Sequence, residues 1–463
     1  MNVTMHDVIV MGGGPAGSTA ASLLARDGFD VALFERDRFP RDHVGESMLP
    51  FCYPLFEDLG VLDKLKRSFV RKPGVRFVDR NGESSTHWCF SHVIHDESYL
   101  SFQVNRAEFD HILLNNSREN GAEVHEETKV KDVDLSDPDG GATVTTVDAA
   151  GIERTHRARF VIDASGRDAL IGSRNGWRKP RAELDRTALW SHWTGVRLRH
   201  GLEEGLSLII YIGEEKKGWI WVFPLSEDRI TAGVVMQNSY IRDQRRKLKG
   251  DATDWKQTLT MQELRFSPLV AELLEGAEQA LPILVNGDYS YEVTNHYGSN
   301  YAMIGDARGF IDPIFSSGVF LSIKTAYLVT AAVKSQLTGT SPGQGVDNPE
   351  LVKAYEMVTG AYNFVHRMIR LFYSPHSITW AEVGAEHQIH KRHESAMGVG
   401  HFMLSGDFFE NHGRYNKFFE LLEDPRAFKR YKNVVLDRKD YHDESCRTPW
   451  DVAFGELASA RSK

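Results

Sequence analysis

Near its N-terminus the chain has a short run of apolar residues that ends in glycines. The stretch HDVIVMGG (6–13) predicts a buried strand, PAGSTAASLLARDG (15–28) a helix of small residues, and DVALFE (30–35) a second strand. Strand, helix and strand in this order predict a βαβ unit with parallel pairing. Two later strands, ARFVIDA (158–164) and YAMIGDARG (301–309), also end in Gly or Asp. In parallel sheets, ligands bind at the edge formed by the carboxyl ends of the strands, where these Gly and Asp residues would lie.

The middle of the chain has a different pattern. Across 187–237 apolar and polar positions alternate in TALWSHWTGVRL, LSLIIYIG, GWIWVFPL and ITAGVVMQ, which predicts an antiparallel sheet with one covered face. After about residue 335 the pattern becomes helical and rich in aromatic residues. We therefore expect an α/β fold in which a Rossmann-like parallel sheet carries an inserted antiparallel, substrate-side sheet and a helical C-terminal region. The expected domains are 1–70, 100–180 and 295–335 for the nucleotide, 71–99 and 181–294 for the sheet, and 336–463 for the helices.

Composition and charge exclude several classes of protein. A formal charge of -9 argues against nucleic-acid binding, and we expect the basic run at 241–250 to be a solvated helix face. No apolar run approaches the roughly 18 residues that span a bilayer, and the N-terminus lacks the features of a signal peptide. Cys52, Cys89 and Cys446 are far apart, so we expect neither a disulfide framework nor a zinc site, and a reducing cytoplasm.

The segment GGGPAG carries a dinucleotide fingerprint. Gly12 allows the tight turn, Gly14 lets backbone approach a pyrophosphate, and Gly17 lets helix and strand pack closely. Glu35 ends the next strand, where a carboxylate binds ribose hydroxyls. The expected nucleotide-binding set also includes Ala16 and Arg36.

Two downstream segments favour FAD over NAD. YAMIGDARGFIDPIFSSGVFLS resembles the Gly-Asp segment of FAD-dependent monooxygenases, which implies that Asp306 binds the ribityl chain. FQVNRAEFD (102–110) resembles the flavin-proximal strand and helix start of the same group, with Arg106 toward the pyrophosphate. Because no second fingerprint for nicotinamide occurs, we expect a separate NAD(P)H flavin reductase to supply reduced FAD.

GWIWVFPL (218–225) narrows the resemblance. It is similar to the WxWxIP motif of flavin-dependent halogenases, with Phe in place of Ile, while the alternative is a plain strand with two aromatics on one face. FPRDHVGESMLP (39–50) resembles the loop of halogenases that act on pyrrolyl and phenolic groups, which implies that Gly45, Glu46 and Ser47 border the flavin. The resemblance covers about residues 5–335. The four motif positions that would separate flavin from substrate are Trp219, Trp221, Phe223 and Pro224.

The resemblance also implies catalytic residues. Lys72 in FVRKPGVRF would receive or hydrogen-bond hypohalous acid, while the alternative is a surface cluster of cations. Halide would bind near Ser317 and Gly318, where free helix N–H groups attract an anion, the alternative being a helix N-cap alone. Pro313 and Gly318 would border the cofactor. Phe315 stands where tryptophan halogenases carry a catalytic Glu, which favours a phenol- or pyrrole-like ring.

The resemblance predicts a halogenase that uses FADH2, O2 and chloride or bromide. Hypohalous acid formed at the flavin would pass through Lys72 to an electron-rich aromatic, either a free small molecule or one tethered to a carrier protein. The alternatives are a flavin monooxygenase, a geranylgeranyl-reductase-like flavoprotein, or a non-catalytic flavin-binding protein. We expect no metal site, because the histidines of HQIH and HKRHES (387–395) are better explained as a polar helix face.

Overall fold

We describe the protein from a computed structural model. The described residues are 4–79, 82, 85–136, 140–213, 218–248, 254–287, 290–341, 343–344, 347–373, 402–413, 415–416 and 445–461. The histidine-rich segment at 387–395 lies outside them, so the structure does not test its interpretation.

The first sheet contains the predicted βαβ unit, formed by β1 (Thr4–Met11), α1 (Pro15–Arg26) and β2 (Val31–Phe34). It joins β10 (Glu153–Asp163) and β19 (Tyr301–Met303) by parallel pairing, and its strand order is β7-β2-β1-β10-β9-β8, with β19 on β10. β7 (Glu123–His125) is parallel to β2, whereas β8 (Thr128–Asp134) and β9 (Ala142–Asp148) are antiparallel. The prediction of a Rossmann-like parallel sheet is confirmed.

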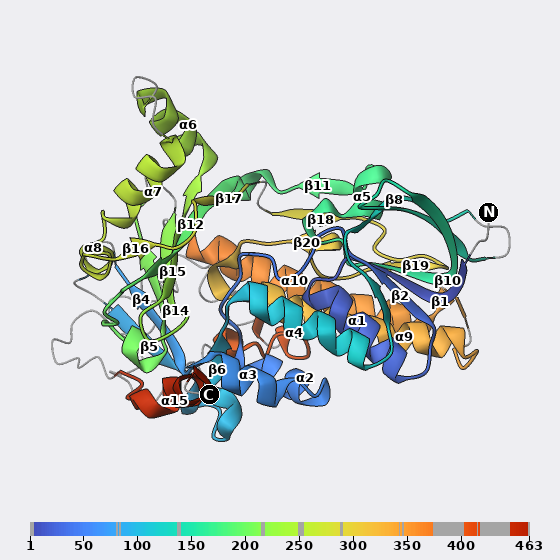
Figure 1. The fold of residues 1–463 in the computed structure, drawn as a ribbon, viewed down its shortest axis with the longest axis horizontal. Coiled ribbons are helices and arrows are strands. Elements are labelled where there is room, and N and C mark those ends of the chain that lie inside the picture. The colour runs from blue at the N-terminus through green and yellow to red at the C-terminus, as the bar shows by residue number, and fades with distance from the viewer. Residues whose placement is uncertain are drawn as a thin grey trace.

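Helices pack on the first sheet. Figure 1 shows α1 beside α4 (Arg106–Glu119) and α9 (Gly318–Leu337), with α10 (Pro349–Phe372) next to α9. Pro349 begins α10, and the Asn348 side chain accepts hydrogen bonds from the backbone N–H groups of Glu350 and Leu351. Smaller elements connect the layers: α2 (Tyr53–Asp58), α3 (Leu62–Ser68), α5 (Leu170–Arg174), and a three-stranded sheet of β11 (Arg178–Pro180), β18 (Tyr291–Val293) and β20 (Gly309–Phe310).

The second sheet has the order β16-β12-β15-β14-β13-β4-β5, with β17 on β12. The bounds of its strands are β4 Gly74–Val78, β5 Ser85–Cys89, β12 Arg186–Thr194, β13 Ser207–Tyr211, β14 Trp219–Pro224, β15 Ile230–Gln237, β16 Glu278–Gln279 and β17 Leu284–Asn286. β3 (Val70–Lys72) and β6 (Ser101–Gln103) pair separately.

Two features of this sheet differ from the predictions. Pairing is antiparallel except between β13 and β4, which run parallel although the sequence pattern predicted an antiparallel sheet. Both faces are covered, since Trp219 and Trp221 pack into one core while Ile220 and Val222 pack into another with α6 (Asn238–Lys247), α7 (Trp255–Leu264) and α8 (Pro268–Leu273). The expectation of one covered face is therefore wrong. Within the described residues, the basic run at 241–247 lies in a largely exposed helix, α6, as predicted.

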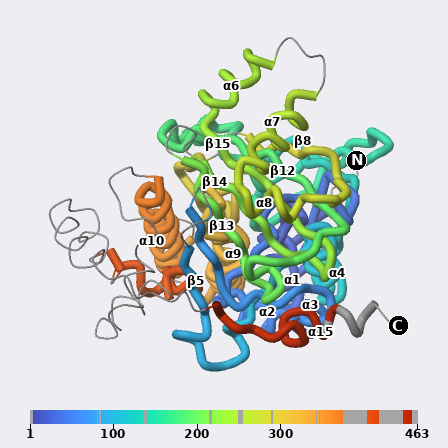
Figure 2. Tube along the Cα trace, turned by 90° about the vertical axis from the view of Figure 1, so that its left-hand side faces the viewer, coloured from blue at the N-terminus to red at the C-terminus, as the bar shows by residue number. Residues whose placement is uncertain are grey.

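The C-terminal helix returns to the second sheet. Figures 1 and 2 show α15 (Trp450–Arg461) below the sheet and next to α3, and Ala453 and Phe454 pack against Val70 of β3. Cys446 forms a disulfide with Cys89. The expectation of no disulfide is thus wrong, because a separation of 357 residues gives no sign that the fold brings the two thiols together. Among the helices that the structure describes, none combines the length and hydropathy of a membrane span.

Candidate active site

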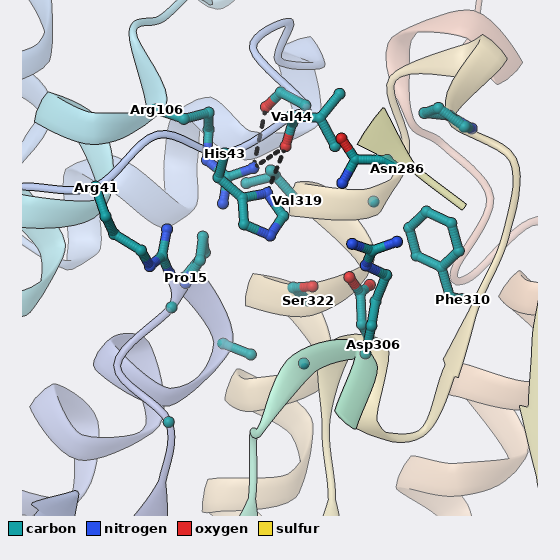
Figure 3. Close-up of a pocket in the computed structure, with 18 of the residues that line it drawn as sticks. Pro15, Arg41, His43, Val44, Arg106, Asn286, Asp306, Phe310, Val319 and Ser322 are labelled. Carbon is teal, nitrogen blue, oxygen red and sulfur yellow. Dashed lines mark hydrogen bonds between the residues drawn. The ribbon is translucent and has the colours of Figure 1, made fainter. Parts of the chain in front are cut away.

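A cavity of about 470 Å³ lies where the first sheet meets the second. Figure 3 shows Arg41 and Arg106 on one side of it and Asp306 and Phe310 on the other. The sequence-predicted residues that line it are Gly12, Gly14, Ala16, Glu35, Arg36, Gly45, Glu46, Ser47, Arg106, Trp219, Trp221, Phe223, Asp306, Pro313 and Gly318. The fold thus brings most of the predicted cofactor residues to one space.

The glycine loop is shaped by close backbone approach. Gly12 has φ +104°, and a Cβ there would lie 2.4 Å from the carbonyl oxygen of Ala164. Gly17 does not line the cavity, but a Cβ on it would lie 1.9 Å from the Gly12 oxygen, so glycine is needed to seat α1 on the loop. Gly14 precedes the N-terminus of this helix of 12 residues, where free N–H groups favour a phosphate.

Carboxylates and cations are paired around the loop. Glu35 is buried, and its side chain accepts hydrogen bonds from the N–H groups of Gly13 (2.6 Å) and Asp37 (2.8 Å). Arg36 pairs with Asp168 at an exposed position. The carboxylate of Glu35 therefore lies beside the glycine loop.

Arg106 supports the loop that follows β2. Its guanidinium pairs with Asp110, at 2.7 Å from Nε to Oδ1, and Nη1 donates to the carbonyl oxygen of Val44 at 2.5 Å (Figure 3). Arg41 shares the same carboxylate at 2.9 Å. Burial and then the charges of Arg106 and Arg41 lower the pKa of His43 to about 3, so this ring is neutral. On the opposite side, burial raises the pKa of Asp306 to about 6 although Arg167 and Arg106 oppose the rise.

An aromatic wall closes the cavity toward the second sheet. Trp219, Trp221 and Phe223 project from one face of β14, and Trp190 of β12 adjoins them. Gly233 lies opposite both Trp190 and Trp221, and a Cβ on it would be 2.3 Å from the Trp221 ring. Pro224 is buried but does not line the cavity. Trp190 and Gly233 were not among the predicted residues, although the alternation in TALWSHW could have indicated Trp190.

Lys72 lies outside the large cavity. It lines a separate space of about 10 Å³ together with Leu49, Val75, Phe77, Phe90, Ser207, Ile209, Ile314, Phe315, Ser316 and Leu404. The side chain is 2% exposed, its Nζ donates to the carbonyl oxygen of Met48 at 3.0 Å, and burial lowers its pKa to about 7. Arg71 is buried as well. The alternative of a surface cluster is therefore wrong for this lysine.

The segment before α9 touches both spaces. Ser316 has φ +54° and lines the large cavity and the lysine chamber alike. Ser317 does not line the large cavity, but its Oγ is buried and has no hydrogen-bond partner among the described residues. Ser317 occupies the N-cap position without making a side-chain cap bond, and the space at Gly318 is open. The side chain of Ser317 therefore does not cap α9.

The described residues hold no group of three or more His, Cys, Asp or Glu side chains suited to a metal ion. This result does not cover the histidines at 387–395.

Comparison with known proteins identifies relatives of the whole arrangement. A family model described as tryptophan halogenase matches residues 7–101 and 90–414. The chain is 35% identical over 335 residues to a tryptophan 2-halogenase of Chondromyces crocatus, an alignment that covers 72% of this chain and 62% of that protein. It is 29% identical to a 1H-pyrrole-2-carbonyl-[peptidyl-carrier protein] chlorinase of Pseudomonas fluorescens, over 71% of this chain and 75% of that protein. The match thus spans less than two thirds of the first relative's length.

Solved structures share the fold. A flavoprotein/dehydrogenase from Cytophaga hutchinsonii superposes with a TM-score of 0.79 at 25% identity, covering 93% of this chain and 99% of that one. The flavin-dependent halogenase CmlS gives a TM-score of 0.72 at 28% identity, covering 100% of this chain and 77% of that one. The two-sheet architecture is therefore that of known flavoproteins.

Proposed function

The chain belongs to the tryptophan halogenase family, and from this premise we propose that it is a flavin-dependent halogenase acting on an electron-rich aromatic ring. The observation that carries the proposal is the separation of two spaces: a large cavity that the aromatic wall closes on one side, and a separate small chamber that encloses a buried lysine, with Ser316 bordering both. A hydroxylase needs its substrate at the flavin, whereas a halogenase needs substrate kept apart from it.

The large cavity fits FAD by its own chemistry. The glycine loop packs tightly on Ala164 at Gly12 and on α1 at Gly17, the α1 N-terminus offers N–H donors, and a buried oxygen of Glu46 lacks a hydrogen-bond partner among the described residues. Gly14 and Arg106 would face the phosphates, Glu35 the ribose and Asp306 the ribityl chain. Reduced FAD together with O2 would supply the oxidation that converts halide into hypohalous acid.

The residues before α9 would hold the halide. Ser317 offers an unpartnered hydroxyl, and the first N–H groups of a helix of 20 residues attract an anion. Because Ser316 borders both spaces, hypohalous acid formed near this turn has a short path to the lysine chamber.

Lys72 would hold hypohalous acid and present it to the ring. A pKa of about 7 lets Nζ be a charged donor or a neutral amine close to neutrality. The chamber around it is largely apolar and contains Phe77, Phe90 and Phe315. Its free volume of about 10 Å³ is room for about one water molecule, so a phenol- or pyrrole-like ring would have to be admitted by a rearrangement of these side chains. The relative named as a pyrrolyl carrier-protein chlorinase makes a carrier-tethered ring a candidate as well.

Product analysis tests the proposal. The protein would be incubated with FAD, NADH, a flavin reductase and chloride or bromide, with phenol, pyrrole-2-carboxylate thioester and tryptophan as separate substrates. We expect halogenated product only when the reductase is present, recognised by its isotope pattern in mass spectrometry. Hydroxylated product without halogen, or rapid NADH oxidation without the reductase, would instead support a monooxygenase or a reductase.

A matched pair of variants tests the role of Lys72. Lys72→Ala should still bind FAD and consume O2 but lose product by about hundredfold or more, because the group that directs the oxidant is gone. Lys66→Ala, which removes a partly exposed lysine of α3, should leave product formation unchanged. Near wild-type halogenation by Lys72→Ala would refute this role.

A further inference from the structure

Three side chains form a line from the large cavity toward the surface. Glu46 comes from the loop after β2, His192 from β12, and Arg229 from the turn between β14 and β15. Glu46 Oε1 lies 2.6 Å from His192 Nε2, and Arg229 Nη2 lies 3.0 Å from His192 Nδ1. Glu46 and His192 are each 1% exposed, whereas Arg229 is half-buried.

The contacts fix which nitrogen of His192 carries the proton. A guanidinium has donors only, so Nδ1 must be the acceptor of the hydrogen bond from Arg229. The remaining nitrogen, Nε2, is then the N–H that donates to Glu46. The imidazole is therefore neutral and lies between a cation and a carboxylate, and it holds the carboxylate in one orientation.

The other oxygen of Glu46 is left for a ligand. Oε2 is buried and has no hydrogen-bond partner among the described residues, and Glu46 lines the large cavity. A buried acceptor without a donor has lost its hydrogen bonds to water and has gained none from the protein. A ligand that offers an N–H group at this position removes that penalty.

We propose that His192 and Arg229 are positioning residues that keep Glu46 oriented as a hydrogen-bond acceptor for the ring N–H that flavin gains on reduction, so that the cavity binds reduced FAD more tightly than oxidised FAD. A carboxylate cannot donate, and the oxidised ring nitrogen is itself an acceptor, so the two repel in that state. The proposal rests on the proposed function only in assuming that the cavity holds FAD. It gives the protein a means of taking reduced flavin from a separate donor.

Binding in two redox states tests the proposal. Dissociation constants would be measured anaerobically for oxidised FAD and for dithionite-reduced FAD, without halide or aromatic substrate. Wild type should prefer reduced FAD. Glu46→Gln, His192→Leu and Arg229→Met should lose about tenfold of this preference, which equals about 30 mV in the two-electron potential of bound FAD.

Two further variants separate positioning from folding. His192→Gln should retain the preference, since its amide N–H can donate to Glu46 while its carbonyl oxygen accepts from Arg229. His366→Leu is the control, because His366 is also a buried histidine beside an arginine and a carboxylate, Arg181 and Glu183, which both contact its Nε2, and none of the three lines the cavity. It should keep the wild-type ratio.

The outcomes are distinct. Equal weakening of both redox states in His192→Leu, with an unchanged ratio, would overturn the proposal, as would a wild type that binds both states equally. A wild type that binds no FAD would overturn the proposed function as well. The binding assay contains neither halide nor aromatic substrate, so its result does not depend on halogenation. Absence of halogenated product in the separate product assay would contradict the proposed function alone.

Discussion

Burial of Lys72 acts against stability. Its pKa falls from 10.5 to about 7 in the fold, so below pH 7 the folded protein carries a buried ammonium whose proton the unfolded chain binds more tightly. Between about pH 7 and 10.5 the unfolded chain holds the proton and the folded chain does not, and the free energy of unfolding rises with pH across this window. The side chain is retained at a cost to the fold, as functional groups often are.

We predict that Lys72→Met stabilises the protein at pH 6.0. Each pKa unit of the shift corresponds to about 1.4 kcal/mol, so the gain in unfolding free energy should be on the order of a few kcal/mol and should shrink as pH rises toward 10. Urea unfolding at several pH values measures it. Lys66→Met, at a partly exposed position, should show no such trend, and an equal gain for Lys72→Met at pH 6 and pH 10 would contradict the explanation.

At the level of residues, local chemistry could be predicted and burial could not. Gly12 and Gly17 follow from a fingerprint whose reasons are local, and the backbone contacts of both agree with it. Lys72 stands between Arg71 and Arg76 in a stretch that resembles an exposed cluster, yet the distant segment that contains Leu404 helps to enclose it. The contact between Glu46 and His192 joins positions 146 residues apart and left no trace in the sequence.

At the level of elements, the N-terminus of α9 should control halide affinity. Proline at the first helical position keeps the helix but removes an N–H, so Gly318→Pro should raise the apparent KM for halide about tenfold or more. Gly318→Ala keeps the N–H and has open space for its methyl group, so its halide KM should stay unchanged. Rates would be measured over a halide series at saturating FAD.

An unchanged halide KM in Gly318→Pro would place the anion elsewhere. Since a proline also restrains Ser317 before it, FAD binding must be measured in parallel. Weakened FAD binding in Gly318→Pro alone would indicate a disturbed turn rather than a lost donor.

The aromatic wall depends on the missing side chain at Gly233. A Cβ there would overlap the ring of Trp221, so Gly233→Ala should lower the free energy of unfolding by about 1–3 kcal/mol and weaken FAD binding. Gly287→Ala, whose Cβ would meet only an ordinary contact at 3.5 Å, is the control and should change neither. Thermal melts with and without FAD measure both effects. A wild-type melting temperature in Gly233→Ala would show that the wall repacks freely.

The type of each element could be predicted better than the elements that pack against it. The strands around 187–237 follow from alternation, and β14 and β15 occupy the expected segments. The second covering layer could not be predicted, because α6, α7 and α8 have no pattern that assigns them to a particular sheet face. The parallel partner of β13 was equally hidden, since β4 precedes it by more than a hundred residues.

At the level of the whole molecule, the Cys89–Cys446 bond holds α15 against β3, the strand that carries Lys72. We predict that Cys446→Ser lowers the free energy of unfolding by about 2–4 kcal/mol, since the crosslink restricts the unfolded chain. Melting temperatures with and without dithiothreitol measure it. The reductant should lower the melting temperature of wild type and leave that of Cys446→Ser unchanged, and equal responses would contradict a formed disulfide.

The position of Cys446 in the chain also determines when the disulfide can form during synthesis. Residue 446 leaves the ribosome after every described residue that lines the two cavities, which lie between Met11 and Leu404. The native pair of cysteines therefore cannot oxidise until the walls of both spaces have already been translated. Until residue 446 is translated, the native contacts that hold the walls of both spaces are therefore non-covalent.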